Sequence, residues 1–372
     1  MNSLNRSLVN VLLSIKEKHP AVSLVDIALH HRILPLVARE PEKFFRHLTK
    51  EEIEKVKHHS EINRKKTIVR AMELCSLAKL FNENGIDFRV LKGIPLSMEL
   101  YGDIGMRQSK DIDILVRKED YSKVILLLKD THDIDCDSNI KYLHHFSIKN
   151  KTSHAHTEVH SRLTELRYFI DSLNLFENKR EISIFDVSIP VLSFENHLLF
   201  LIAHGAKHAW FRLMWLSDIA AFGTQKYFDL QKFLILAEKH NLSRVVISSF
   251  MTCQRVFGIF NDSIEQFEKA AQTDNKIYQL ININLNSIYS LDVKGVRSAF
   301  FHELSAKLKE LWHWNLLKKD LRFKFYVFEK HFFASHNTVT LPLPDKLHFL
   351  YIFLHPFLAF YRWANAKCLS KY

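Results

Sequence analysis

Two aspartates on one short apolar segment are the residues of this sequence that most directly suggest chemistry. Residues 111–116, DIDILV, have the length and composition of a buried strand. Strand side chains alternate between faces, so Asp111 and Asp113 share one side. Two carboxylates this close raise each other's proton affinity unless a cation lies between them, and hard divalent cations such as Mg²⁺ prefer oxygen ligands. The pair therefore predicts a metal site.

Four further polar or backbone-permissive residues precede this pair. Lys92 and Gly93 follow a short apolar segment, and Arg107 and Ser109 come directly before the aspartates. A D-x-D pair on its own arises by chance in many chains, and its plain alternative is a solvated strand end. The complete run, K-G followed by R-x-S-x-D-x-D, is far more specific than either half.

This run resembles the nucleotidyltransferase superfamily that includes DNA polymerase beta. It is most similar to the uncharacterised bacterial nucleotidyltransferase family, which has the succession L-K-G, Y-G-D, R and D-I-D-I-L-V, and more distantly to AbiEii-type toxin nucleotidyltransferases. Two features depart from the superfamily. Ile94 stands where serine or glycine is usual, which removes a hydroxyl from the phosphate site, and the interval from Gly93 to Asp111 is longer than in polymerase beta.

The resemblance implies a metal-dependent nucleotidyltransferase, which moves a nucleotidyl group from an NTP to an acceptor hydroxyl and releases pyrophosphate. On this hypothesis Asp111 and Asp113 bind one or two Mg²⁺ or Mn²⁺ ions, and Glu158 completes the metal site and helps to deprotonate the acceptor. Alternation within an expected strand at residues 155–163 puts Glu158 and His160 on one face. His160 is expected to support the ligands from outside the metal site. The alternative is an edge strand whose polar residues face water.

The same resemblance implies which groups bind the nucleotide. Gly93 would let the backbone approach the phosphates. Lys92 and Ser109 would neutralise or hydrogen-bond phosphate oxygens, and Arg107 would either do the same or orient the strand. The acceptor is not implied by the resemblance, and RNA, a protein side chain and a small molecule all stay open.

A histidine-rich segment at residues 204–222 resembles the second marked region of the same family. Lys207 and Arg212 are expected to be cations for the triphosphate. Supporting roles are expected for His204, His208 and Asp218. A zinc site is not indicated, because the glutamate of an H-E-x-x-H motif is absent. The alternative is a buried polar network that fixes the contact between two domains.

The elements that must position these residues are expected to form an α+β fold. Its centre is a small mixed-sheet nucleotidyltransferase core at residues 86–165. An N-terminal helical region at 1–85, a helical domain at 166–300 and a basic, aromatic-rich helical region at 301–372 would flank it. Strands are predicted at residues 88–91, 111–116, 143–148 and 155–163, and helices at 51–82, 94–101 and 118–129.

Composition limits the class of protein and its partners. The chain of 372 residues is 47% hydrophobic, enough for a large core. Its net charge is +11 at pH 7, with over half of the excess in residues 301–372. Such a surface favours polyanions, whether nucleotide, RNA or acidic lipid, without choosing among them. The four cysteines are widely spaced, so no disulfide partner is expected, and a reducing cytoplasm fits.

Residues 345–363 contain an uncharged aromatic run that Pro356 interrupts and that is too short to span a bilayer. The run is expected to pack against the body as a terminal helix, with an acidic membrane surface as the alternative partner. Two other functions therefore stay open. One is a non-catalytic binding or scaffold protein that retains the fold, and Ile94 is its main support. The other is a peripheral membrane enzyme of envelope or polysaccharide synthesis.

Overall fold

The computed structural model divides by its internal contacts into two units, Met1–Glu165 with Ile170–Leu291, and Leu166–Phe169 with Asp292–Tyr372. It describes residues 2–135, 144–171, 173–226, 228–291, 300–332, 340–344, 347, 350–351, 353–354, 357–358 and 360–361. The second unit contains α14 (Phe300–Leu317) and α15 (Leu321–Phe332). The expected division into regions at residues 85, 165 and 300 stays a prediction.

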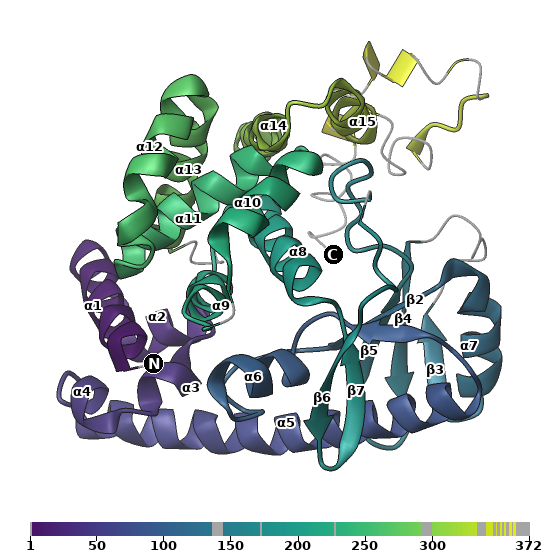
Figure 1. Cartoon of the computed structure of the whole chain (residues 1–372), viewed down its shortest axis with the longest axis horizontal. Helices are drawn as coiled ribbons and strands as arrows, with labels where there is room; N and C mark the ends of the chain where they lie inside the picture. The colour runs from purple at the N-terminus through teal and green to yellow at the C-terminus, as the bar shows by residue number, and fades with distance from the viewer. Residues whose placement is uncertain are drawn as a thin grey trace. The chain divides into compact units, whose positions relative to one another are not determined.

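Within the described residues, seven strands form one mixed sheet in the first unit, with the order β3-β4-β5-β2-β1-β7-β6 (Figure 1). The strands are β1 (Phe88–Val90), β2 (Ile112–Val116), β3 (His132–Asp135), β4 (His145–Asn150), β5 (His156–His160), β6 (Arg180–Ile184) and β7 (Val187–Val191). The β2–β5 and β1–β7 pairs are parallel, and the other pairs are antiparallel. The expected mixed-sheet α+β fold is confirmed.

One face of this sheet carries the hydrophobic core. Ile112, Ile114 and Val116 of β2 pack there against apolar residues of α5 (Lys50–Glu83) and α7 (Tyr121–Leu128). Figure 1 shows α5 running along this side of the sheet. The predicted alternation of β2 is therefore confirmed, and it leaves Asp113 on the opposite face.

Local signals fix the ends of the elements beside the site. A capping box starts α5, because Thr49 accepts from the Glu52 backbone while the Glu52 side chain accepts from Thr49 N–H. The helix α6 (Ile94–Tyr101) has Gly93 as its N-cap and ends at Gly102, which is left-handed.

The remaining helices of the first unit pack mainly against one another. They are α1 (Asn2–Lys18), α2 (Leu24–His30), α3 (Leu34–Ala38), α4 (Pro41–Phe45), η1 (Lys118–Asp120), α8 (Phe194–Lys207), α9 (Leu213–Gly223), α10 (Leu230–Lys239), α11 (Ser243–Phe257), η3 (Asn261–Ser263), α12 (Ile264–Thr273) and α13 (Lys276–Tyr289). The predicted helices at 51–82 and 94–101 are confirmed.

The prediction that the chain is helical throughout residues 166–300 is wrong at residues 180–191, where β6 and β7 form a hairpin. Its two-residue turn is Phe185-Asp186, and both residues have positive φ, 47° and 62°. Such turns are usually signalled by Asn-Gly or Asp-Gly, because glycine adopts positive φ without strain. Because Phe185 occupies a turn position where glycine or asparagine is usual, the hairpin was not predicted. The strand β3 was also not predicted.

The aromatic run at residues 345–363 lies mostly outside the described residues, so its expected packing and its membrane alternative stay predictions. Among the helices that are described, none combines the length and apolarity needed to cross a bilayer.

A buried histidine holds the end of β1 against α8. His197 is fully buried, its Nε2–H donates to the carbonyl of Leu91 at 2.8 Å, and its Nδ1 lies 3.4 Å from the guanidinium of Arg180. Burial, with Arg180 beside it, lowers the pKa of His197 to about 3. The ring is therefore neutral in the folded protein at neutral pH.

Acidification should destabilise the protein through this residue. Because the folded pKa lies below the unfolded value, the unfolded state binds the proton first, and stability is lost as pH falls below about 6.5. We expect His197→Asn to remove about 1 kcal/mol per pH unit from the slope of unfolding free energy between pH 6 and pH 4, measured by urea denaturation. The exposed His58→Asn variant is the control, and equal slopes for the two variants would contradict the assignment.

Candidate functional site

The parallel register of β2 and β5 brings two acidic side chains together. Asp113 lies directly opposite Glu158, and Leu115 lies opposite His160, so both residues of β5 point to the same face as Asp113. The ligand atoms of Asp113, Glu158 and His160 all lie within 4.8 Å of one another. These three residues are called the metal-ligand cluster below. The Asp113 side chain is 4% exposed, whereas that of Glu158 is 36% exposed.

The donor set of this cluster fits a divalent cation. His160 Nε2 lies 3.4 Å from Asp113 Oδ1 and 3.3 Å from Glu158 Oε2, but neither contact is a hydrogen bond. This nitrogen is buried and, among the described residues, has no hydrogen-bond partner. A nitrogen aimed between two carboxylates without bonding to either is the arrangement expected of groups that share a metal ion.

Lys92 neutralises the buried aspartate in the protein itself. Its Nζ lies 2.5 Å from Asp113 Oδ2 and 3.5 Å from Asp111 Oδ1. Burial opposes a charged lysine, but Asp113 and Asp111 outweigh burial and raise the pKa of Lys92. Burial likewise opposes the ionised Asp113, yet Lys92 and His160 hold the pKa of Asp113 far below its usual range. The two aspartates are thus joined through one ammonium group.

The backbone at Gly93 places the start of α6 beside these carboxylates. Gly93 has φ 85° and ψ −125°, a conformation that side chains strongly disfavour. A Cβ at this position would meet Ser109 Oγ at 3.5 Å, which is ordinary contact, so the backbone conformation demands glycine. Ser109 Oγ donates to the carbonyl of Asp111 at 2.7 Å and fixes the approach to β2.

A cavity of about 500 Å³ collects most of the predicted site residues. Its lining includes Lys92, Asp111, the metal-ligand cluster and, from α8 and its C-cap, His204, Lys207 and His208. Lys207 Nζ donates to the carboxylate of Glu165 at 2.8 Å. Burial, with Lys92 nearby, keeps the pKa of His204 well below its ordinary value. Side chains that are as far apart in the sequence as Lys92 and His208 thus line the same cavity.

Arg107 lies in a separate buried network. Its Nε donates to Asp218 Oδ2 at 2.9 Å, and the hydroxyl of Tyr101 donates to Asp218 Oδ1 at 2.9 Å. The backbone N–H of Arg107 also donates to Ser97 Oγ at 3.0 Å. All four residues are buried. The network ties α6 and the segment before β2 to α9.

Comparison with known proteins identifies the family. The model of a family described as uncharacterised nucleotidyltransferase matches residues 20–258. The chain belongs to this family. No curated protein matches the sequence. Among solved structures, an antigenic nucleotidyltransferase-like protein from Paracoccidioides brasiliensis is similar over 47% of this chain and 91% of its own, with 13% identity and a TM-score of 0.31.

Several residues that line the cavity of this nucleotidyltransferase family member were not singled out from the sequence. They are His144, His145, Glu165 and Phe200. His145 lies opposite His160 in the β4–β5 register, and the two rings stack with centroids 5.4 Å apart. The only sequence signal was two adjacent histidines at the start of a strand, and their partner became evident only from the pairing of β4 with β5.

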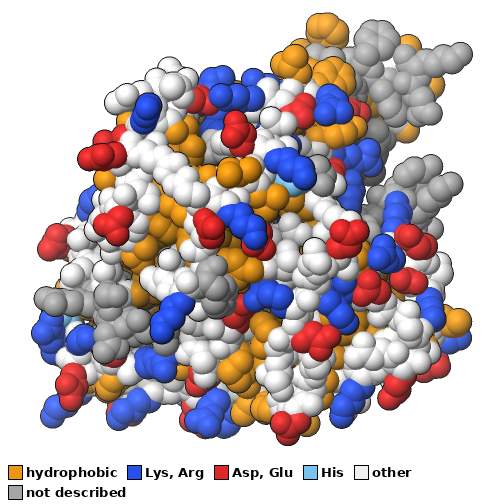
Figure 2. Space-filling model, in the orientation of Figure 1, with side chains coloured by type: hydrophobic (Ala, Val, Ile, Leu, Met, Phe, Trp, Pro, Cys, Tyr) orange, Lys and Arg blue, Asp and Glu red, His pale blue; other side chains and the backbone are white. Residues whose placement is uncertain are grey.

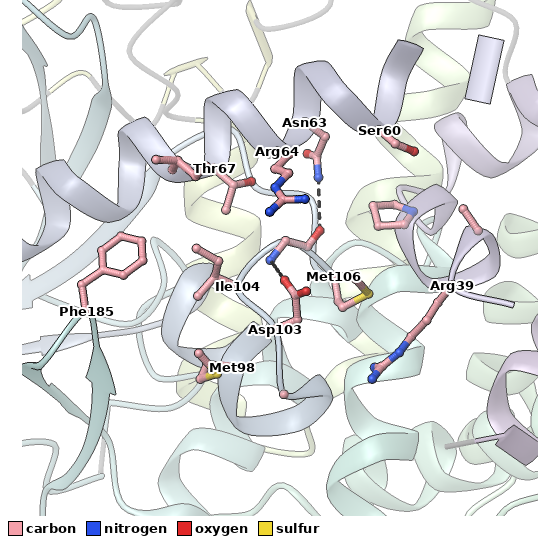
Figure 3. Close-up of a pocket in the computed structure, with 15 residues that line it drawn as sticks. Arg39, Ser60, Asn63, Arg64, Thr67, Met98, Asp103, Ile104, Met106 and Phe185 are labelled. Carbon is pink, nitrogen blue, oxygen red and sulfur yellow. Dashed lines mark hydrogen bonds between the residues drawn. The ribbon is translucent and has the colours of Figure 1, made fainter. Parts of the chain in front are cut away.

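A second cavity, of about 760 Å³, lies between α3, α5 and the loop at residues 102–106 (Figure 3). Asn63 of α5 extends toward this loop and donates to the carbonyl of Gly105 at 3.1 Å. Arg64 points from α5 into the same region (Figure 3). No lining residue is shared with the cavity of the metal-ligand cluster. In this family member the two cavities are therefore separate.

The buried network makes a testable contribution to stability. Asp218→Asn removes the charge that compensates Arg107, and breaking a buried ion pair in this way costs about 3–5 kcal/mol. Tyr101→Phe removes one hydrogen bond and should cost only about 1–2 kcal/mol. Both values are measurable by urea denaturation. Asp262→Asn, at an exposed position, is the matched control, and a loss for Asp218→Asn no larger than for this control would refute the role of the network.

Proposed function

We propose that this protein is a divalent-metal-dependent nucleotidyltransferase, which transfers a nucleotidyl group from an NTP to an acceptor hydroxyl and releases pyrophosphate. Its membership of the uncharacterised nucleotidyltransferase family supports nucleotidyl transfer in general. The observation that carries the specific proposal is the metal-ligand cluster, in which two carboxylates and one unbonded imidazole nitrogen converge within 4.8 Å beside Lys92.

The residues that would hold the metal are those of the cluster. Asp113, Glu158 and His160 would bind Mg²⁺ or Mn²⁺, and Asp111 would join them once it no longer shares Lys92 with Asp113. When bound, the cation supplies charge neutralisation for the phosphates and for the developing charge of an in-line displacement. An imidazole ligand would favour Mn²⁺ over Mg²⁺, since magnesium prefers oxygen ligands.

The nucleotide would lie along the start of α6. The first backbone N–H groups of a helix have no partner within it and attract anions; in α6 these are the N–H groups of Ile94 and Leu96, because Pro95 has none. Lys92, Ser109 and Lys207 would neutralise or hydrogen-bond phosphate oxygens. Each of these three currently has a protein partner, so phosphate binding would replace an existing contact.

In the transfer step, one bond to phosphorus forms, one breaks, and a residue of the cluster accepts the proton. The acceptor oxygen would form a bond to the α-phosphorus while the bond from that phosphorus to the β-phosphate oxygen breaks, and pyrophosphate leaves. The proton of the acceptor hydroxyl would pass to Glu158, the most exposed carboxylate of the cluster. His160 lowers the pKa of Glu158, which keeps this carboxylate ionised but makes it a weaker base than an ordinary glutamate.

RNA, protein and small molecules all remain candidate acceptors. On the face shown in Figure 2, lysine and arginine side chains are interspersed with aspartate and glutamate. An extended polynucleotide is usually bound along a surface of one charge sign. The described part of this face therefore gives RNA no advantage over a protein or a small molecule.

A non-catalytic scaffold is the second candidate, and the Lys92–Asp113 ion pair favours it. This pair already neutralises the aspartate without any metal. Ile94 also leaves the phosphate site without the usual hydroxyl. A scaffold would keep the fold and the buried charges but would not transfer a nucleotide.

Nucleotide transfer can be tested with the four α-labelled NTPs in parallel, with MgCl₂ or MnCl₂ and with cell RNA, cell protein or small-molecule extract as acceptor. We expect label in one acceptor fraction. Asp113→Asn and Glu158→Gln should each lower the transfer by about 100-fold or more, because each removes a metal ligand. Asp133→Asn, an exposed position on β3 of the same sheet, should transfer as the natural protein does.

One result would contradict the assigned site, and another would contradict nucleotidyl transfer itself. Equal transfer by the natural protein and by Asp113→Asn would exclude the metal-ligand cluster as the site. Absence of both label and NTP binding, the latter measured by calorimetry with MnCl₂ present, would favour the scaffold.

A further inference from the structure

Two arginines from distant parts of the first unit, Arg32 and Arg70, interact with Asp111, and a third, Arg212, lies near Arg32. Arg32 and Arg212 meet where α2 ends and α9 begins. The Nδ1 of buried His31 accepts from Leu213 N–H at 3.3 Å, and the His31 carbonyl accepts from Met214 N–H at 3.2 Å. Arg32, the next residue, and Arg212, the N-cap of α9, therefore lie at the same junction.

The third arginine comes from α5. Arg70 Nε donates at 3.1 Å to the carbonyl of Lys110, which directly precedes Asp111 in the chain. Burial lowers the pKa of both Arg32 and Arg70, and the carboxylate of Asp111 partly offsets this effect in each case. Arg32, Arg70 and Arg212 are called the arginine cluster below.

Among the described residues, the charges of the arginine cluster are only partly compensated, through the nearby carboxylate of Asp111. All three side chains are half-buried, and among the described residues none forms an ion pair of its own with a carboxylate. Arg212 Nε is buried without a hydrogen-bond partner in this part of the chain, and its guanidinium instead lies 4.7 Å from the ring centre of Phe211. Burial, with Arg32 nearby, lowers the pKa of Arg212 to about 10. Three half-buried cations near one carboxylate, which Lys92 also approaches, leave an excess of positive charge, so a bound anion would stabilise this arrangement.

The position of the arginine cluster near Asp111 indicates which anion it would bind. Asp111 lines the cavity of the metal-ligand cluster and also interacts with Arg32 and Arg70. Gly93 and the start of α6 lie beside the same residue, since a Cβ on Gly93 would be 3.9 Å from the Asp111 carbonyl. A nucleotide with its α-phosphate at the carboxylates could therefore extend its outer phosphates past Asp111.

We propose that the arginine cluster binds the β- and γ-phosphates of the NTP, the two that leave together as pyrophosphate. This inference rests on the proposed function, and it assigns Arg32, from the turn between α2 and α3, and Arg70 of α5 to the site alongside Arg212. Guanidinium groups suit this role because each offers several donors in a planar fork that matches phosphate oxygens. Arg32 and Arg70 near Asp111, with Arg212 near Arg32, suit a compact, multiply charged group better than an extended chain.

Inorganic pyrophosphate is the probe, because it contains the two phosphates without a base or sugar. Calorimetry in MnCl₂ would compare the natural protein with Arg32→Gln, Arg70→Gln and Arg212→Gln. We expect each variant to bind pyrophosphate about 10-fold more weakly. Affinity for AMP, which lacks the outer phosphates, should stay the same. Arg64→Gln, on α5 beside the other cavity, is the matched control and should bind both probes as the natural protein does (Figure 3).

Folding and charge are separated by a second set of variants. Lysine at the same three positions keeps the positive charge and should retain most of the pyrophosphate affinity, whereas a folding defect would persist. Failure of the natural protein to bind pyrophosphate, or unchanged affinity in all three glutamine variants, would overturn the proposal. A loss of affinity for single-stranded RNA without loss for pyrophosphate would also overturn it and assign the cluster to an acceptor.

The results of this experiment can reject the arginine cluster and the proposed function independently of each other. Loss of pyrophosphate binding in the glutamine variants, with no transfer detected in any acceptor fraction, would support the arginine cluster and reject the enzyme. Transfer that is unaffected by the three variants, with unchanged pyrophosphate binding, would support the enzyme and reject the cluster.

Discussion

The parallel pairing of β2 with β5 is the constraint on which the candidate site depends. It puts Asp113 opposite Glu158 and directs His160 to the same face. A slip of one residue would move these groups to the other face of the sheet. That face carries Ile112, Ile114 and Val159, which pack against α5 and α7. The hydrophobic core therefore fixes the register, and the acidic cluster is a consequence of the same packing.

This register creates an electrostatic problem that the surrounding cations relieve. Asp113 is buried beside a second carboxylate, and Lys92 lies against it at 2.5 Å. Lys92 is itself positioned by Leu91, whose N–H donates to the Asp113 carbonyl and whose carbonyl accepts from His197. The arginine cluster adds positive charge on the side of Asp111. Buried anions that can share a metal, surrounded by cations that can meet phosphates, are the environment that phosphoryl and nucleotidyl transfer require.

Local patterns in the sequence were sufficient for the elements that carry the first half of the site. The alternation of DIDILV, the helix at residues 94–101 and the turn at Gly93 were each encoded by neighbouring residues, and the structure confirms the strand and the helix. The contact of Arg107 with Asp218, the pairing of His145 with His160 and the position of Arg32 depend on residues far apart in the chain, so no local pattern revealed them. The β6–β7 hairpin escaped because Phe185 occupies a turn position that usually signals itself with asparagine or glycine.

The central claim is that Asp113, Glu158 and His160 share one divalent cation. Its most direct test is the anomalous scattering of Mn²⁺ in crystals grown with MnCl₂ and a non-hydrolysable NTP. We predict a manganese peak at about 2.2 Å from an oxygen of each carboxylate and from His160 Nε2, with Lys92 displaced from Asp113. A peak bound elsewhere, or no peak with Lys92 still against Asp113, would contradict it.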